Sequence, residues 1–281
     1  MDIVREWLED LRAALSDELL VIDARVGVFY TAIQLSAGDA GVAFTPRDLS
    51  DTVCCPKTAA GAPPAGQLIG RKAWELAEWA LVPSPLRRAL GVATLNALSA
   101  VALNRYGPFQ GELRVGLDAL DATEIVVSDR VVMVGALVPF IKAVKRVGAQ
   151  IRIIDKHPNA LKPEERPLWV PPERAAEALG SADVAIITGS ALVEGGIDEL
   201  LGWAAGARIR VIAGPTAPLW PAPFFIHGVD ILGGIQVRDA ATLLTIVGQG
   251  GSGYLFARAA EKVCVLNRAA PALAERFARS A

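Results

Sequence analysis

The chain has 281 residues, of which 52% are hydrophobic, and it carries 28 Lys and Arg against 30 Asp and Glu, a formal net charge of −2. This length exceeds the roughly 150 residues of an average domain, and the hydrophobic share excludes a disordered chain. With so small a net charge, the chain lacks the overall positive field that would attract a nucleic acid or an anionic membrane. We therefore expect two folded domains, with no nucleic acid and no membrane among the partners.

The sequence shows no sign of export. Its apolar runs are interrupted by Gly, Pro or charge before the ~20 residues that a membrane span needs, and it opens with charged residues rather than a basic and then apolar signal segment. The three cysteines, Cys54, Cys55 and Cys264, cannot all pair. Reduced thiols and a cytoplasmic location are the predictions that follow.

Residues 1–106 are predicted to form an α+β domain. An amphipathic pattern begins after Asp2, a residue suited to cap a helix. β-branched and aromatic residues then predict strands, and a turn cluster before the last of them indicates an antiparallel meander. The expected elements are a helix from residue 3, strands between 19 and 35, a strand at 42–44, and helices around 74–81 and 85–103.

A second domain is predicted over residues 107–281. The segment 104–109 contains Gly107 and Pro108, and the periodicity changes there. Beyond it, short runs that are apolar on both faces alternate with helical stretches, as in a parallel sheet covered by helices. The predicted class is therefore α/β, an N-terminal α+β domain followed by a Rossmann-like parallel-sheet domain. The five expected strands are 131–134, 151–154, 184–187, 211–213 and 231–235.

The residues that follow these strands are the candidate site, because ligands bind at the carboxyl ends of strands in an open parallel sheet. Gly135 follows the first strand, but the G-x-G-x-x-G cradle for a dinucleotide is absent. Asp155 follows the second strand, 155 − 135 = 20 residues later, where an acidic residue commonly contacts a ribose hydroxyl. Capping of the strand-to-helix turn explains Asp155 equally well. His157 is interpreted as a solvated loop residue rather than as a base or a metal ligand.

Hydroxyl and glycine residues follow the third and fourth strands. Thr188 and Ser190 flank Gly189, which allows close backbone approach, so this corner is predicted to accept an anion. A Gly189→Val substitution is then expected to block binding and to leave the fold intact. Thr216, between two prolines, is the second expected contact. Helix capping and turn formation are the alternative roles for these residues.

Two further segments carry weaker signals. The glycine-rich stretch 248–254 lacks the Lys-Ser or Lys-Thr of a phosphate-binding loop, and we interpret it as a flexible turn. Cys54 and Cys55 offer half of a soft-metal site, or pack as small core residues. The sequence contains no serine-hydrolase elbow, zinc-protease motif or kinase signature.

The stretch from Thr188 to Leu201, TGSALVEGGIDELL, resembles the signature of a bacterial and archaeal family described as putative heavy-metal chelation. The likeness covers nearly the whole chain, although Glu194 stands where the family usually has an asparagine. The other similar segments are GVFYTA (27–32), GVAFTP (41–46), LGVATLNAL (90–98) and GPTAP (214–218).

The resemblance implies an N-terminal domain like that of enolase, a Rossmann-like second domain, and a site in the cleft where they meet. It also implies a metal ion or a metal complex as the bound species. Under this interpretation Asn96 and Tyr30 point into the cleft. Otherwise Asn96 bonds to a neighbouring backbone group and Tyr30 ends a strand.

We predict a protein that binds a small ligand or a metal in the interdomain cleft, with Asp155 as an acidic anchor. The alternative is an enzyme that holds a nucleotide or an S-adenosylmethionine-like cofactor through Gly135 and Asp155, and a structural scaffold is a third interpretation. The sequence leaves open the ligand, any reaction and whether the protein is a homo-oligomer. The predicted ligand-binding residues are Gly135, Asp155, Thr188, Gly189, Ser190, Thr216, Asn96 and Tyr30.

Overall fold

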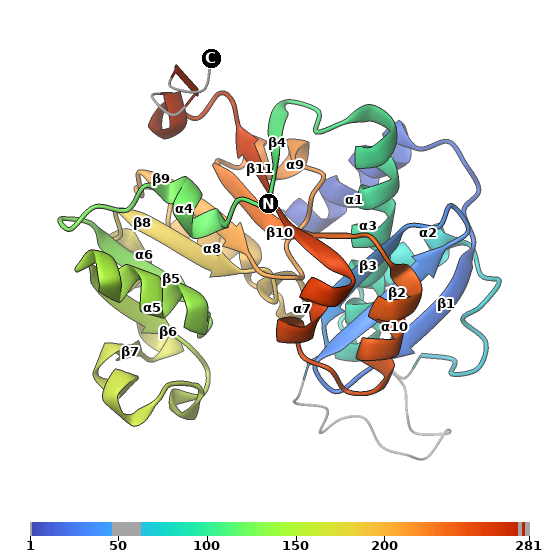
Figure 1. Ribbon diagram of the computed structural model, residues 1–281, viewed down its shortest axis with the longest axis horizontal. Helices are drawn as coiled ribbons and strands as arrows, with labels where there is room; N and C mark the ends of the chain where they lie inside the picture. Colours follow the sequence, from blue (N-terminus) through green and yellow to red (C-terminus); the bar gives the residue numbers. More distant parts are fainter. Residues whose placement is uncertain (1, 47–62, 275–276, 279–281) are drawn as a thin grey trace.

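The computed structural model describes residues 2–46, 63–274 and 277–278 and has a mixed α/β fold with one three-stranded and one eight-stranded sheet (Figure 1). The strands are β1 (Val21–Val26), β2 (Tyr30–Leu35), β3 (Ala40–Phe44), β4 (Gly111–Val115), β5 (Arg130–Val134), β6 (Gln150–Ile154), β7 (Trp169–Val170), β8 (Val184–Thr188), β9 (Ile209–Ala213), β10 (Ile231–Val237) and β11 (Ala260–Asn267). The α-helices are α1 (Ile3–Ala14), α2 (Ala73–Ala77), α3 (Pro85–Tyr106), α4 (Ala119–Thr123), α5 (Val138–Val147), α6 (Ala175–Gly180), α7 (Ala191–Glu194), α8 (Ile197–Trp203), α9 (Ala222–Ile226) and α10 (Ala240–Gly248). The 3₁₀ helices are η1 (Glu78–Leu81), η2 (Pro158–Ala160), η3 (Pro163–Leu168), η4 (Pro172–Arg174), η5 (Gly253–Arg258) and η6 (Pro271–Leu273).

The helices predicted for the N-terminal part are confirmed. The Asp2 carboxylate accepts the N–H of Arg5 at 3.1 Å and caps α1, and Pro85 opens α3, where its missing N–H is harmless. The buried Trp7 indole donates to the Ser99 hydroxyl at 3.0 Å, so α1 is fastened to α3. This bond satisfies two polar groups that would otherwise be stranded in the core.

The three-stranded sheet lies between α3 and α10 (Figure 1). Successive residues of β2 point to opposite faces, so Ile33 packs in the cluster that contains α3, and Ala32 packs in the cluster that contains α10. The backbone of α3 approaches β3 closely at Gly41, where a Cβ would lie 2.2 Å from the Ala97 nitrogen. A helix from the C-terminal half therefore covers one face of the N-terminal sheet.

The large sheet has the strand order β4-β11-β10-β9-β8-β5-β6-β7. The strands from β10 to β7 are parallel, whereas β11 runs antiparallel to both β10 and β4. Helices α4 and α5 pack on one face of this sheet, and α6 and α8 pack on the other. All five strands expected from the sequence are confirmed, while β4, β7 and β11 were not predicted.

Helix α3 is the one helix in the described ranges that is long and apolar enough to cross a membrane, judged by length and composition. From the sequence, every apolar run was expected to be interrupted before the length of a membrane span. In the structure, 78% of its most apolar 18-residue window is buried against the rest of the chain. The core helix of a folded domain has the same character, since it is apolar around its whole circumference.

The two sheets separate where the sequence places the domain boundary, between the end of α3 at Tyr106 and the start of β4 at Gly111. The apolar cores do not separate there, because the largest buried cluster combines α1 and α3 with residues of β8, β9 and β11. Trp7, for example, packs edge-on against Phe224 with ring centroids 5.5 Å apart. The division into domains 1–106 and 107–281 stays a prediction, as do its enolase-like and Rossmann-like assignments.

Candidate functional site at the carboxyl edge of the large sheet

The loops that follow β5 and β8 are in contact at the carboxyl edge of the large sheet. Gly135 has a φ of 85°, in the left-handed region that favours glycine. A Cβ at this position would lie 2.8 Å from Cγ2 of Thr188, so any larger residue would displace that side chain. The glycine therefore allows Thr188 to lie directly beside the start of the β5 loop.

Two hydroxyl groups lie side by side at this edge. The Oγ1 of Thr188 and the Oγ of Ser190 are 3.2 Å apart, and the backbone N–H of Ser190 points to the same Oγ1 at 3.3 Å. Both residues are partly exposed. A hydroxyl has one proton to donate and two lone pairs, so this pair retains hydrogen-bonding capacity for another group.

Asp155 fastens the loop after β6 to the loop after β5. Its Oδ2 accepts the N–H of Ala136 at 3.0 Å, and its Oδ1 accepts the N–H of His157 at 2.9 Å. Its backbone carbonyl accepts the indole N–H of Trp169 at 2.8 Å. These bonds give Asp155 the turn-capping role that the sequence analysis left open beside the ribose contact.

Gly189 approaches backbone of its own chain. A Cβ on Gly189 would lie 2.5 Å from the Ala217 nitrogen and 2.8 Å from the carbonyl carbon of Thr216. Backbone atoms cannot rotate away as the end of a side chain can. The expectation that Gly189→Val leaves the fold intact is therefore wrong, because the added side chain would push the loops after β8 and β9 apart.

Thr216 and Asn96 connect this edge to the N-terminal sheet. The buried Thr216 hydroxyl accepts the N–H of Phe44, at the end of β3, at 2.9 Å. The Asn96 amide donates to the carbonyl of Thr216 at 3.1 Å and to the carbonyl of Val42 at 2.8 Å. The structure thus shows for Asn96 the backbone contact that the sequence analysis gave as one of two roles.

Tyr30 lies where the N-terminal sheet meets the glycine-rich segment. Its ring packs edge-on against Phe256, with centroids 4.9 Å apart. A Cβ on Gly253 would lie 3.1 Å from the Tyr30 hydroxyl oxygen and 3.3 Å from Cγ of Pro215. Within segment 248–254, which we expected to be a flexible turn, Gly253 begins η5 and is in close contact with the loop after β9.

Sequence reasoning missed an ion pair at this edge. The Lys156 ammonium lies 3.1 Å from Oε2 of Glu194, with the two side chains 61% and 31% exposed. Lys156 directly follows Asp155 after β6, and Glu194 ends α7 after β8. The position of Lys156 after a predicted strand was a usable signal.

The amino edge of the same sheet carries aspartates beside arginines. The carboxylate of Asp183 accepts two hydrogen bonds from the Arg130 guanidinium, both at 2.9 Å, and a third from the Arg130 N–H. These bonds hold the pKa of Asp183 well below its usual range. The buried Asp129 accepts from Arg208 at 2.8 Å. Burial instead raises the pKa of Asp230, which accepts the N–H at the start of β9.

Ligands for a bare metal ion are scarce in the described ranges. No three His, Cys, Asp or Glu side chains within them lie together as a metal site. The His227 ring bonds to the Glu6 carboxylate at 2.6 Å, and the buried Cys264 thiol donates to a backbone carbonyl at 3.2 Å. Cys54 and Cys55 lie outside the described residues, so their predicted reduced state stays a prediction.

Two models of families described as putative heavy-metal chelation match the chain, DUF364 over residues 118–266 and DUF4213 over residues 8–99. Crystal structures of DUF364 proteins of unknown function from Desulfitobacterium hafniense DCB-2 and Pyrococcus horikoshii align with TM-scores of 0.73 and 0.71 and identities of 20% and 21%. Each alignment covers 94% of this chain and 98% of the other, and it bears on the fold alone. An uncharacterized protein of Methanocaldococcus jannaschii is 24% identical over 182 residues, 63% of this chain and 65% of that protein, so the match spans less than two thirds of this relative.

Proposed function

This chain belongs to the DUF364 family, described as putative heavy-metal chelation, and from that premise we propose that it binds a small anionic ligand, such as a metal complex with an organic acid, at the carboxyl edge of its large sheet. The site consists of the loops after β5 and β8, with the N-terminal sheet held beside them through Thr216. We also propose that this site is the interdomain cleft expected from the sequence.

The observation that carries the proposal is the hydroxyl pair of Thr188 and Ser190. The hydroxyls lie 3.2 Å apart and are partly exposed. Gly135 has no side chain, so Thr188 lies directly against the start of the β5 loop and its hydroxyl is held at this edge. Adjacent hydroxyl donors on fixed loops are suited to hold one end of an anion.

The donor set favours a complexed metal over a bare soft one. Soft metal ions select thiolate and imidazole ligands. Within the described residues this edge offers hydroxyl oxygens, and both oxygens of Asp155 already accept backbone N–H groups. An organic chelator would supply the metal ligands itself and present its acid groups to the hydroxyl donors.

The same engagement of Asp155 argues against the alternative of a nucleotide-dependent enzyme. A ribose-binding carboxylate has to accept hydrogen bonds from the hydroxyl groups of the sugar. Here the carboxylate holds two loops of its own chain together. We therefore keep ligand binding as the proposal and put forward no reaction.

Native mass spectrometry with elemental analysis, on protein purified without chelators, tests this function. We expect a bound small acid or metal complex near one equivalent. Combined Thr188→Val and Ser190→Ala substitutions should remove the bound species, because they delete both hydroxyls.

The matched control is Ser181→Ala with Thr245→Val, which deletes two hydroxyls that bond to helix carbonyls away from this edge. The control protein should retain the bound species. Protein that carries no small molecule, or a species retained equally by both variants, would contradict the proposed function.

A further inference from the structure

We propose that Lys156 is the cationic recognition group of this site and that Glu194 holds its ammonium in place until an acid group of the ligand, a carboxylate or a phosphate, displaces the Glu194 carboxylate. This inference rests on the proposed function and defines the charge and chemistry of the ligand. It gives the missed ion pair a role in binding.

The pair lies across the end of one strand. In the large sheet β5 lies between β6 and β8. Lys156 belongs to the loop after β6, and Glu194 ends the helix after β8, so their 3.1 Å contact joins the two loops that flank the end of β5. Gly135 is the first residue of the loop between them, and the bond from the Ala136 N–H to Asp155 fixes the root of the Lys156 loop.

The same pair brings the ammonium near the hydroxyls. The N–H of Glu194 donates to the carbonyl of Ser190 at 2.9 Å, which is an i to i+4 helical bond. Side chains at this spacing lie on one face of a helix, with Cβ atoms about 5–6 Å apart. Glu194 therefore projects from the same helix face as Ser190, and the proposed ligand reaches from the Ser190 hydroxyl to the ammonium that Glu194 holds.

The pair is built to exchange partners. Lys156 and Glu194 side chains are 61% and 31% exposed, and exposed ion pairs contribute little to stability. The ammonium is a compact charge on a flexible stem with three donors, so it can move from one oxygen acceptor to another. By contrast, the Glu165 partner of Lys145 is only 7% exposed, and its displacement would strand a buried carboxylate.

Isothermal titration calorimetry with inorganic pyrophosphate and with citrate tests the proposal and separates the two acid chemistries. We expect the wild-type protein to bind at least one of them. Lys156→Met should weaken that binding by about tenfold or more, the effect of losing one charge-assisted hydrogen bond. Glu194→Gln should tighten it by about two- to fivefold, because the competing carboxylate is removed.

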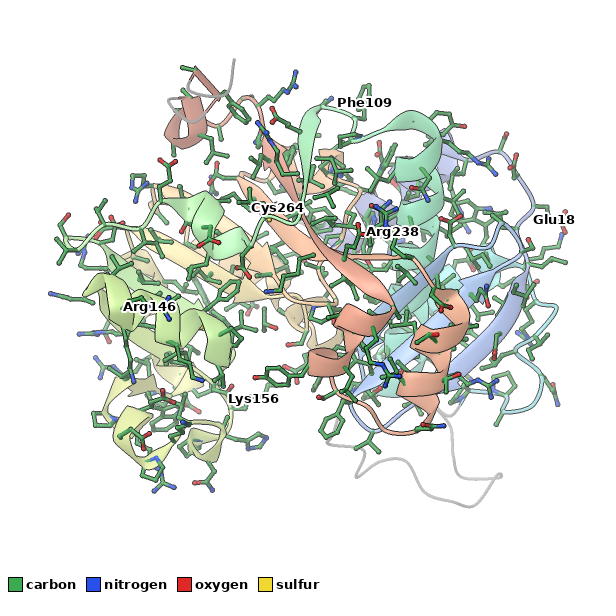
Figure 2. The ribbon with its side chains drawn as sticks, in the orientation of Figure 1. Glu18, Phe109, Arg146, Lys156, Arg238 and Cys264 are labelled. Atoms are coloured by element: carbon green, nitrogen blue, oxygen red, sulfur yellow. The ribbon has the colours of Figure 1, made fainter. Side chains whose placement is uncertain are left out.

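The matched control is the Lys72–Glu18 pair, with an Nζ to Oε1 distance of 2.8 Å and side chains 54% and 63% exposed. Figure 2 shows Glu18 at the right edge of the molecule, well away from Lys156, which lies below the centre of the view. Lys72→Met and Glu18→Gln change charge by the same amounts as the test variants. They should leave both affinities within about twofold of wild type, since long-range effects are screened by salt.

The outcomes separate the two proposals. Wild-type binding that Lys156→Met leaves unchanged would overturn the role of Lys156 while the proposed function stands. Weaker binding in Glu194→Gln would overturn the holding role of Glu194. If neither anion binds the wild-type protein at millimolar concentration, the proposal that Lys156 recognises an acid group is wrong. The proposed function is then decided by the mass-spectrometric test alone.

Discussion

At the amino edge of the large sheet, aspartates lie beside arginines and backbone N–H groups, whereas at the carboxyl edge glycines, two hydroxyls and an exposed ion pair follow the strands. Asp183 accepts three hydrogen bonds from Arg130, and Asp230 accepts the N–H of Arg210 at 2.8 Å. The carboxylates of Asp183 and Asp230 at the amino edge thus accept hydrogen bonds from their own chain. At the carboxyl edge, the hydroxyls of Thr188 and Ser190 contact each other, and both residues stay partly exposed.

The difference separates stabilising contacts from groups that are available to a ligand. Strand starts present backbone N–H groups that need acceptors, and the aspartates of the amino edge supply them. At the carboxyl edge, Asp155 and Thr216 serve the same structural purpose, because they accept N–H groups of neighbouring loops. The carboxyl edge is therefore itself divided, with Asp155 and Thr216 engaged in holding the loops and the partly exposed hydroxyls of Thr188 and Ser190 left for binding.

The largest effect is expected where the backbone of the carboxyl edge is tightest. Gly189→Ala places a Cβ 2.5 Å from the Ala217 nitrogen and should lower the free energy of unfolding by about 3 kcal/mol, the upper range for overpacking. Gly202→Ala, in α8 with nothing within 4 Å of its added Cβ, should raise stability by about 0.5 kcal/mol. Urea unfolding measures both. Equal stability of the two variants would mean that the close approach at Gly189 is not structural.

Thr216→Val should lower the free energy of unfolding by about 2 kcal/mol, because the isosteric side chain leaves the Phe44 N–H without its acceptor. Thr245→Val, at an exposed helical position, should change it by less than about 0.5 kcal/mol. Thermal unfolding followed by circular dichroism gives the comparison. If Thr216→Val leaves the free energy of unfolding unchanged, this hydroxyl is not needed to join the two sheets. Thr216 would then again be a candidate ligand contact.

Asp183→Asn probes the amino edge through pH. Arg130 lowers the folded pKa of Asp183 below its ordinary 3.8, so the stabilisation is fully present above that value and is lost as the pH falls through the folded pKa. At pH 7 the variant should be less stable by about 1 kcal/mol, since the pair is partly solvent-screened. Urea unfolding at pH 7 and below pH 3 measures the gap, which should shrink in acid. A gap that stays constant with pH would contradict the charge-based account.

The smallest effect on stability is expected at the exchangeable pair. Lys156→Met should change the free energy of unfolding by less than about 0.5 kcal/mol, because both partners are exposed. Arg130→Met at the amino edge should lower it by more, because Asp183 loses a bidentate partner. Differential scanning calorimetry ranks the two. A larger loss for Lys156→Met would make this pair a structural contact and weaken the contrast between the edges.

Local sequence pattern was sufficient for the parallel part of the fold. Short runs such as 184–187 are apolar on both faces and identify buried parallel strands, and Asp2 and Pro85 mark helix starts by their capping chemistry. Strand β11 was missed although its buried core, 263–266, is equally apolar. Its antiparallel pairing with β4 depends on residues about 150 positions away, and local periodicity carries no such information.

The site could be predicted in outline because strand ends share one edge, and the structure brings Gly135, Thr188 and Ser190 together there. The roles of individual residues could not. Whether Gly189 faces a ligand or the loop after β9 depends on a contact of 2.5 Å with Ala217 that no spacing rule indicates. The Lys156–Glu194 pair joins residues 194 − 156 = 38 positions apart on two loops, so it appears only in three dimensions.

Amide chemical-shift mapping of the ¹⁵N-labelled protein during titration with pyrophosphate tests most directly whether the carboxyl edge is the binding edge. The account predicts that the largest shifts occur at the amides of Gly135, Ala136, Gly189 and Ser190, while that of Arg130 at the amino edge stays in place. Saturating shifts centred on the amino edge, or spread without a centre over the large sheet, would contradict it.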